Sequence, residues 1–397
     1  MKYPYNLSMD LSAIQTALRE NGFDAWLFYD HHHRDPIAYR VLGLSEHLHV
    51  TRRWYYLIPA QGEPQKLVHN IESHHLDTLP GGTRSYSSWQ EQQQHLREIT
   101  APHTTLAMQY SPDNLIPYIG LVDAGTIELL RSFGKKIVSS GDLVAQFEAT
   151  WSAAQIASHY AARDSVDKIM AAAFDEIGRR VRKGGAHEYG IAQFIREAFR
   201  RENMTDENPI VGVNAHSADP HYSPSAEDSL PIREGDFVLL DMWGRKLGDE
   251  RNAYYDITWT GMVGAPTARH QEIFAIVRDA RKAAVAKAKS AFDAGQKLEG
   301  WQVDDAARNL IREKGYVDEF FHRTGHSIGS SDVHGNGANM DNIETKDTRQ
   351  VLPNSCFSVE PGIYFRGDFG VRSEVNVLIE NGKAVVTGRE QEELVKI

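Results

Sequence analysis

Residues 237–260 read FVLLDMWGRKLGDERNAYYDITWT, and this stretch decides how the second half of the chain is interpreted. Four apolar residues followed by Asp241 predict a buried strand that carries a carboxylate near its end. Residues 254–258 predict a second strand, with Asp256 embedded in it. Glycines in the intervening segment favour a turn, so we expect a hairpin that brings both carboxylates to neighbouring strands.

Two later strand-like segments carry glutamates, Glu360 in SVEPGIY and Glu374 in VRSEVNV. A buried carboxylate must be paired, protonated or bound to a metal. With Asp241, Asp256 and His326 these residues form an oxygen-rich set with one imidazole. Four carboxylates balance two divalent ions, so the set predicts two metal ions, most naturally Mn²⁺, with Co²⁺, Zn²⁺ or Fe²⁺ as alternatives. Taken singly, each acid is more often a salt-bridge partner or a surface residue, so the prediction depends on the joint pattern.

The surrounding sequence predicts an α+β domain over residues 151–397. Helical patterns occur in two pairs, each followed by short strands, and the expected helical stretches are 153–183, 187–203, 266–292 and 300–315. Helices followed by strands, twice over, indicate a domain with two similar halves.

Residues 1–150 have a different pattern of predicted secondary structure, because helix-like and strand-like segments alternate. Helical patterns cover 11–20 and 125–133, and strand patterns cover 24–29, 53–59, 106–109 and 136–139. This alternation predicts an α/β domain with a mixed or parallel sheet. A chain of 397 residues exceeds what one hydrophobic core usually supports, so we expect two domains, 1–150 and 151–397, although no Pro/Gly-rich linker marks the boundary.

The composition excludes several classes of protein. Hydrophobic residues make up 41% and charged residues 24% of the chain, which argues against disorder or a fibre. The net charge of -11 argues against general affinity for nucleic acid or an anionic membrane. The start, MKYPYNLSMDLSAIQ, lacks the apolar core of a signal peptide, and no apolar stretch approaches the ~20 residues of a membrane helix. The single cysteine, Cys356, lies in a strand-like segment that predicts a packed thiol, and we expect a cytoplasmic protein.

Read in order, the acidic segments resemble the pita-bread metallopeptidases, the family of Xaa-Pro aminopeptidases, prolidases and methionine aminopeptidases. That family has an Asp that ends one strand, a second Asp in a D-I-T-x-T context, a G-H-x-I-G histidine, and E-P-G-x-Y and G-x-R-x-E motifs. Here these elements are Asp241, Asp256–Thr260, Gly325–Gly329, Glu360–Tyr364 and Gly370–Glu374. All five ligand positions are filled in order, which makes the resemblance specific.

The resemblance also covers the N-terminal part. An α/β domain of this length belongs to the Xaa-Pro peptidases and creatinase, whereas methionine aminopeptidases generally lack it. The resemblance therefore implies a creatinase-like domain over 1–150 and a pita-bread domain with a curved antiparallel sheet over 151–397. It implies a prolidase or aminopeptidase P that acts on proline-containing di- or oligopeptides. In that group the N-terminal domain helps to close the active site, often across a dimer, so a homodimer is implied.

The same resemblance implies a role for each metal ligand. Asp241 holds one metal and His326 the other, while Asp256 and Glu374 bridge the pair. Glu360 binds the metal on the His326 side and shuttles the proton of the attacking water.

Four more residues receive roles from the resemblance. Arg372 pairs with nearby carboxylates, a task that suits a guanidinium group. His221, in a P-H-Y element, and His334, a few residues past His326, contact the substrate carbonyl or the tetrahedral intermediate. Tyr364 of the E-P-G-x-Y motif binds the substrate.

Several positions depart from the family pattern. The loop between the aspartates is longer than usual within 245–252, which makes Asp249 a rival ligand, although it lies in a polar turn. Trp259 stands where Arg is common. One extra residue separates His326 from His334, and Gly-Asn-Gly follows His334 in place of an acidic residue. These changes alter the pocket wall and leave the ligand set intact.

The triple histidine at 31–33 is not predicted as a metal site, because adjacent side chains point in different directions. A strand is expected to end near Asp30, so we expect these histidines in a surface loop or in one that reaches towards the substrate.

Three hypotheses follow from the sequence. A Xaa-Pro exopeptidase accounts for the full ligand set and the N-terminal domain. A non-peptidase hydrolase or lyase on the same scaffold, acting on a small molecule with a metal, is the alternative that a substrate panel would separate. A catalytically inactive binding module is disfavoured, because such relatives usually lose ligands and this chain keeps all five.

Overall fold

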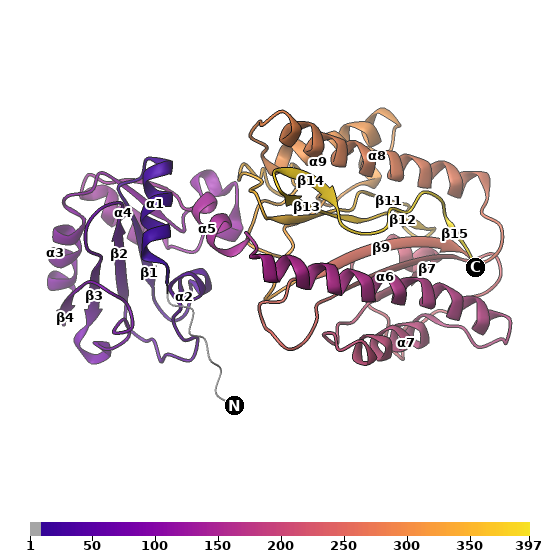
Figure 1. Cartoon of the computed structure of the whole chain (residues 1–397), viewed down its shortest axis with the longest axis horizontal. Coiled ribbons are helices and arrows are strands. Elements are labelled where there is room, and N and C mark those ends of the chain that lie inside the picture. The colour runs from indigo at the N-terminus through magenta and orange to yellow at the C-terminus, as the bar shows by residue number, and fades with distance from the viewer. Residues whose placement is uncertain (1–8) are drawn as a thin grey trace. The chain divides into compact units, whose positions relative to one another are not determined.

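The computed structural model describes residues 9–397, and contacts divide the chain into one unit that ends at Glu148 and a second that begins at Ala149 (Figure 1). Each unit has hydrophobic clusters of its own. Residues 1–8, where the stretch read for a signal peptide begins, lie outside the described residues. No helix among residues 9–397 is both long and apolar enough to cross a membrane.

The first unit is built on a mixed sheet with the strand order β4-β3-β2-β1-β5-β6. Neighbouring strands are parallel except that β2 runs antiparallel to both β1 and β3. The strands are β1 (Ala25–Asp30), β2 (Trp54–Pro59), β3 (Gln65–His69), β4 (Gly82–Tyr86), β5 (Thr105–Met108) and β6 (Lys136–Ser139). The central strands β1 and β2 are buried along their whole length, as expected for a sheet covered on both faces.

Helices cover both faces of this sheet because successive side chains of β1 point to opposite sides. Trp26 and Phe28 pack with α1 (Leu11–Asn21), α2 (Pro36–Leu42) and α5 (Gly141–Glu148). Leu27 and Tyr29 pack with α3 (Trp89–Thr100) and α4 (Ala124–Ser132). The first unit is therefore a three-layer α/β structure. The short helices η1 (Asn70–Glu72), η2 (Pro112–Asn114) and η3 (Pro117–Ile119) lie in its connections.

The second unit contains a sheet with the order β15-β9-β8-β7, a sheet with the order β10-β13-β14 and the ribbon β11-β12. All of these pairs are antiparallel except β15 with β9. The strands are β7 (Ile210–Val213), β8 (Phe237–Gly244), β9 (Tyr255–Met262), β10 (Cys356–Val359), β11 (Gly362–Tyr364), β12 (Gly370–Arg372), β13 (Val375–Glu380), β14 (Lys383–Val386) and β15 (Val395–Lys396). The sheets are thus mixed, and the expected antiparallel arrangement does not extend to β15, whose pairing carries the chain end back along β9.

Each half of the second unit pairs two helices with its strands. Helices α6 (Ala153–Val181) and α7 (Glu188–Arg201) share a core with β7, β8 and β9. Helices α8 (Ala268–Asp293) and α9 (Gly300–Glu313) share another with β10 to β14. The short helices η4 (Asn214–Ala218) and η5 (Val317–Glu319) complete the element order.

The two halves meet where β9 approaches the connection between β12 and β13. The backbone N–H of Glu374 donates to the carbonyl of Thr258 (3.1 Å). The N–H of Asp256 donates to the side-chain oxygen of Asn376 (3.0 Å). These two bonds join the sheets at the positions of the predicted acidic ligands.

The lone thiol lies in the second half of this unit. Cys356 is the first residue of β10, is 1% exposed, and pairs with Leu378 of β13. Burial raises the pKa of this thiol well above its ordinary value, so the packed, unreactive cysteine that the sequence predicts is what the structure contains.

Candidate metal centre

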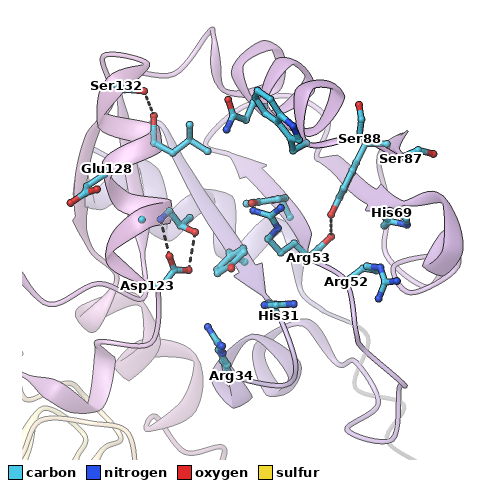
Figure 2. Close-up of a pocket in the computed structure, with 18 residues that line it drawn as sticks. His31, Arg34, Arg52, Arg53, His69, Ser87, Ser88, Asp123, Glu128 and Ser132 are labelled. Carbon is cyan, nitrogen blue, oxygen red and sulfur yellow. Dashed lines mark hydrogen bonds between the residues drawn. The ribbon is translucent and has the colours of Figure 1, made fainter.

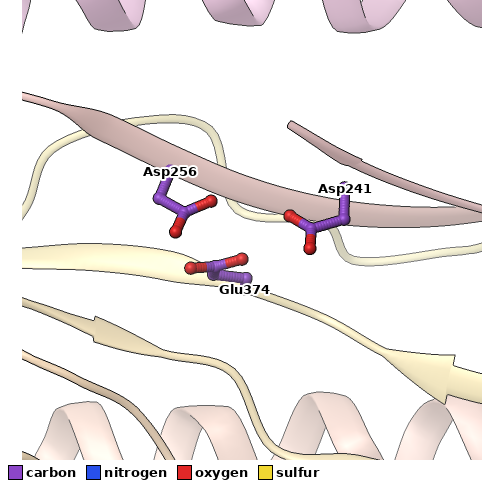
Figure 3. A group of neighbouring side chains, drawn as sticks. All are labelled: Asp241, Asp256 and Glu374. Carbon is purple, nitrogen blue, oxygen red and sulfur yellow. The ribbon is translucent and has the colours of Figure 1, made fainter. Parts of the chain in front are cut away.

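Three carboxylates converge between the two halves of the second unit. Asp241 on β8 lies opposite Thr258 on β9, and Asp256 lies two residues before Thr258, so the two aspartates share one face of the hairpin. Glu374 reaches the same point from the connection between β12 and β13. One oxygen from each of the three carboxylates lies within 4.8 Å of the others (Figure 3).

These carboxylates are buried and incompletely satisfied. Asp241 is 7%, Asp256 6% and Glu374 1% exposed. One oxygen of each, Oδ1, Oδ1 and Oε1 respectively, has no hydrogen-bond partner among the described residues. Burial raises the pKa of Asp241 to about 7 and the pKa values of Asp256 and Glu374 well above their ordinary range. Buried anionic oxygens without donors require protons or cations, and hard oxygen donors suit divalent ions.

Arg372 on β12 supplies one positive charge to the cluster. Its guanidinium group donates to Oδ2 of Asp241 and, through Nε, to the hydroxyl of Thr258 (3.0 Å). That hydroxyl in turn donates to Oε2 of Glu374 (2.9 Å). Arg372 and Thr258 therefore fix one oxygen of Asp241 and one of Glu374, while the second oxygen of each has no donor among the described residues.

His326 and Glu360 lie at the other side of the cluster. Nε2 of His326 is 3.5 Å from Oδ2 of Asp256 and 3.5 Å from Oε1 of Glu360. Nδ1 of His326 lies 3.0 Å from the carbonyl of Ser327, which fixes the proton on Nδ1 and leaves the lone pair of Nε2 facing the acids. Burial opposes ionisation of Glu360, but the nearby imidazole of His326 and guanidinium of Arg372 together lower its pKa.

Of the remaining predicted site residues, two lie against the cluster. The ring of His334 packs edge-on against the ring of His326, with centroids 4.2 Å apart. Tyr364 on β11 is buried, and its hydroxyl lies 2.8 Å from Nε2 of His322. Burial lowers the pKa of His322 to about 4, so this imidazole is neutral and accepts the hydrogen bond.

His221 is not brought into contact with the acids. It is exposed on the loop after η4, and among residues 9–397 its imidazole forms no hydrogen bond with the cluster. The neighbouring Tyr222 is buried instead, with its hydroxyl donated to the carboxylate of Glu188 (2.7 Å). Ser217 of η4 accepts from the N–H of Gly370 (2.9 Å), which ties this segment to the strand that carries Arg372.

The sequence of this unit matches a known family over most of its length. The sequence model described as metallopeptidase family M24 matches residues 163–381, more than half of the chain. The chain belongs to metallopeptidase family M24. This confirms the family resemblance of the five motifs, and the family implies divalent metal ions.

Relatives of this M24 chain are peptidases. An uncharacterized peptidase of Staphylococcus saprophyticus is 31% identical over 271 residues, which are 66% of this chain and 70% of the relative. The Xaa-Pro dipeptidase of Pyrococcus furiosus is 34% identical over 230 residues, 57% of this chain and 59% of that enzyme. The chain thus spans less than two thirds of the Pyrococcus enzyme, although it spans more of the staphylococcal one.

Solved structures show the same fold over the whole chain. Dipeptidase PepE from Mycobacterium ulcerans has a TM-score of 0.69 at 24% identity, with all of both chains covered. The prolidase from Pyrococcus horikoshii has a TM-score of 0.61 at 24% identity, with 97% and 99% covered. An X-prolyl aminopeptidase from Caenorhabditis elegans, described as a cytosolic enzyme with a di-nuclear active site, has a TM-score of 0.64 at 15% identity and is covered over 62% of its length.

The rival acid of this M24 chain is engaged elsewhere. Asp249 is exposed, and its carboxylate pairs with the guanidinium group of Arg251 (2.7 Å). Hydrogen bonds from Arg251 lower the pKa of Asp249 to about 2. The acid closes its own turn and is not part of the cluster.

Sequence reasoning missed three residues that hold the site. Thr258 belongs to the D-I-T-x-T motif, which assigns it no role, yet it bonds both Arg372 and Glu374. Asn376 is a lone polar residue in the apolar run of β13, a signal that could have identified its contact with Asp256. His322 follows two phenylalanines and carried no signal for its bond with Tyr364.

The triple histidine belongs to the first unit and does not surround one point. The rings of His31 and His32 are 4.3 Å apart, whereas Nε2 of His33 lies 2.6 Å from the carbonyl of Leu48. The expected divergence holds for His33 and is wrong for His31 and His32, whose rings contact each other.

Proposed function

We propose that this M24 chain is a dinuclear metallo-exopeptidase that hydrolyses the bond before proline. The observation that carries the proposal is the group of donor-free oxygens on Asp241, Asp256 and Glu374 beside the lone pair of His326. These residues and Glu360 would hold two divalent ions, most naturally Mn²⁺. Such ions, when bound, lower the pKa of a water molecule and polarise a carbonyl group.

In this proposal the protein side chains position the substrate and move the proton. Glu360, whose pKa is lowered, takes the proton of the attacking water and delivers it to the leaving proline nitrogen. His334, packed on His326, donates to the oxygen of the tetrahedral intermediate, and His221 assists from the loop after η4. Arg372 holds Asp241, and Tyr364 contacts the substrate.

The choice of proline peptides is supported by relatives rather than by the cluster itself. The Pyrococcus furiosus relative is named a Xaa-Pro dipeptidase, and a Mycoplasma pneumoniae relative is named a putative Xaa-Pro aminopeptidase. We further propose that residues 1–150 form the creatinase-like domain of this branch, that residues 151–397 form the catalytic domain, and that the protein is a cytoplasmic homodimer. Analytical ultracentrifugation would check the dimer.

The test is proline release by metal-free protein reconstituted with Mn²⁺. Substrates are Xaa-Pro dipeptides and a longer peptide with proline at its second position. Release from dipeptides alone identifies a prolidase, and cleavage of the longer peptide identifies an aminopeptidase. No cleavage at full metal occupancy would overturn the proposal in favour of a non-peptidase hydrolase or lyase.

A matched pair of variants assigns the activity to the cluster. Asp256→Asn should abolish turnover and lower the bound metal, because it removes an anionic ligand and changes almost no volume. Asp249→Asn makes the same chemical change at the exposed acid paired with Arg251 and should leave both unchanged. Full activity in Asp256→Asn would contradict the assignment of the centre.

A further inference from the structure

A cavity of about 870 Å³ lies wholly within the first unit (Figure 2). Tyr29, His69 and Tyr86, from the ends of β1, β3 and β4, line it. These strands run in the same direction, so their carboxyl ends meet at one edge of the sheet. Ligands of open α/β sheets bind at this edge, and the volume is that of a small-molecule site.

The wall of the cavity is rich in positive charge. Arg34, Arg52 and Arg53 line it, and none of the three has a carboxylate partner within residues 9–397. The acids of the lining are Glu128 on α4 and Asp123, the N-cap residue of α4, whose carboxylate accepts from the N–H and hydroxyl of Thr126, each at 2.9 Å. Arg52 donates through Nη1 to the carbonyl (3.4 Å) and hydroxyl (3.0 Å) of Thr51, so Arg34 and Arg53 are the guanidinium groups that we expect to meet an anion.

The loop that carries Arg34 is held in a strained form. His32 and His33 have φ angles of 62° and 55°, in the left-handed region that side chains other than glycine rarely adopt. The carboxylate of Asp30 accepts from the N–H groups of His33 (3.2 Å), Arg34 (2.7 Å) and Asp35 (3.1 Å). Such strain persists only where the surroundings over-determine it, and it concentrates at ligand sites. The loop thus presents His31 and Arg34 to the cavity at a fixed position (Figure 2).

An aromatic surface lies at the rim of the same cavity. Trp89 is the first residue of α3 and is 60% exposed. The capping box between Ser88 and Glu91 fixes this helix start, so the indole is exposed on an ordered element. An ordered, exposed indole offers a flat face on which a ring can stack.

We propose that this cavity binds a small organic anion, a molecule with a phosphate or carboxylate group beside a flat ring. Arg34 and Arg53 bind the anionic group, and Trp89 stacks on the ring. The site is independent of the metal centre, because every residue that lines it belongs to the first unit.

Isothermal titration of the full chain with AMP, nicotinate and adenosine tests the proposal. We expect one site per chain for AMP, nicotinate or both, and none for uncharged adenosine. Binding of AMP alone identifies a phosphate ligand, and binding of nicotinate alone a carboxylate ligand. Arg34→Gln and Arg53→Gln should each weaken binding about tenfold or more, whereas Arg84→Gln, the same charge change on exposed β4, should not.

Two results would overturn the proposal. One is the absence of binding by either anion at millimolar concentration. The other is equal affinity in Arg34→Gln and Arg84→Gln, which is also the result if the anion binds at the metal centre. Trp89→Ala changes an exposed position that does not support the core, and it should weaken the binding of AMP while leaving the binding of inorganic phosphate unchanged. This variant keeps the test valid if Arg53→Gln does not fold.

Discussion

Arg372 places a positive charge directly against the acidic cluster. It is 3% exposed and contacts Asp241 and Thr258, while Glu360 lies 3.8 Å from its Nε. Removing one member of a buried ion pair leaves the other buried and unpaired, which costs far more than losing an exposed pair.

We therefore expect Arg372→Leu to lower the free energy of unfolding of the metal-free protein by about 3–5 kcal/mol. Arg196→Leu removes a partly exposed arginine that pairs with the exposed carboxylate of Asp206 and should cost under about 1 kcal/mol. Urea denaturation followed by circular dichroism measures both. Equal losses in the two variants would show that Arg372 is not bound to buried carboxylates.

A buried histidine outside the cluster makes stability depend on pH. His159 on α6 is fully buried, with Nδ1 2.6 Å from the carbonyl of Tyr254 and Nε2 2.8 Å from the hydroxyl of Thr387. Burial lowers its pKa to about 4. The unfolded chain, with a pKa near 6.5, therefore takes up this proton first as the pH falls.

We expect stability to be lost as the pH falls from about 6.5 to about 4, by up to about 3 kcal/mol from this residue. His159→Asn should be less stable than wild type at pH 7 and should lose less stability over that range. Melting temperatures of metal-free protein at several pH values check this. The same slope in both proteins would assign the pH dependence to other groups.

Residue identities at the site could be predicted from the sequence, because the motifs follow a fixed order. The two aspartates lie on strands as predicted, whereas Glu360 directly follows β10 and Glu374 directly precedes β13. Contacts that form only where the two halves of the second unit meet could not be predicted from the sequence. Thr258 bonds a residue more than a hundred positions later, and nothing local indicates that partner. The position of His221 depends on an irregular loop whose backbone has no periodic pattern.

At the scale of elements, long periodic segments were predicted well. The helices expected at 153–183 and 266–292 are observed as α6 and α8 with small shifts at their ends. Elements of the first unit with weak apolar patterns were missed. Helix α3 is mostly polar and buries few side chains, and the middle of edge strand β4 is exposed, so neither shows a clear period.

The segment that presents His326 depends on close approach of two backbones. Gly325 pairs with Met340, and a Cβ added at Gly325 would lie 1.9 Å from the carbonyl oxygen of Ser358 on β10. A side chain at this position must push the segment away from β10 and His326 away from Asp256.

We expect Gly325→Ala to weaken Mn²⁺ binding by roughly tenfold or more, although no ligand is changed. Gly185→Ala, where an added Cβ meets nothing within 4 Å, should bind Mn²⁺ like wild type. Titration with metal buffers measures both. Unchanged affinity in Gly325→Ala would show that His326 is positioned by other contacts.

At the scale of the whole molecule, the residues of the proposed metal centre all lie in the second unit. The acids, His326 and Arg372 all lie after Ala149. Binding to the folded state stabilises whichever unit contains the site, by about 2.7 kcal/mol at a metal concentration 100 times the Kd.

Calorimetry of the chelator-treated chain should therefore show two transitions. Adding Mn²⁺ should raise the midpoint of the second unit's transition by about 5–10 °C and leave the other in place. Mg²⁺ at equal concentration controls for ionic strength. A single transition that shifts as a whole would mean that the two units unfold together.

The single cysteine provides a natural probe of motion in the second unit, because its rate of reaction with a thiol reagent can be measured. The carbonyl of Cys356 accepts from the N–H of Ile328, two residues past His326, and both Cys356 and Ile328 belong to one buried hydrophobic cluster. A thiol reagent reaches it only during brief excursions that lift β10 away from its neighbours. The rate of labelling therefore reports the frequency of those excursions without an engineered probe. Metal that binds Glu360 and His326 should lower the rate of labelling.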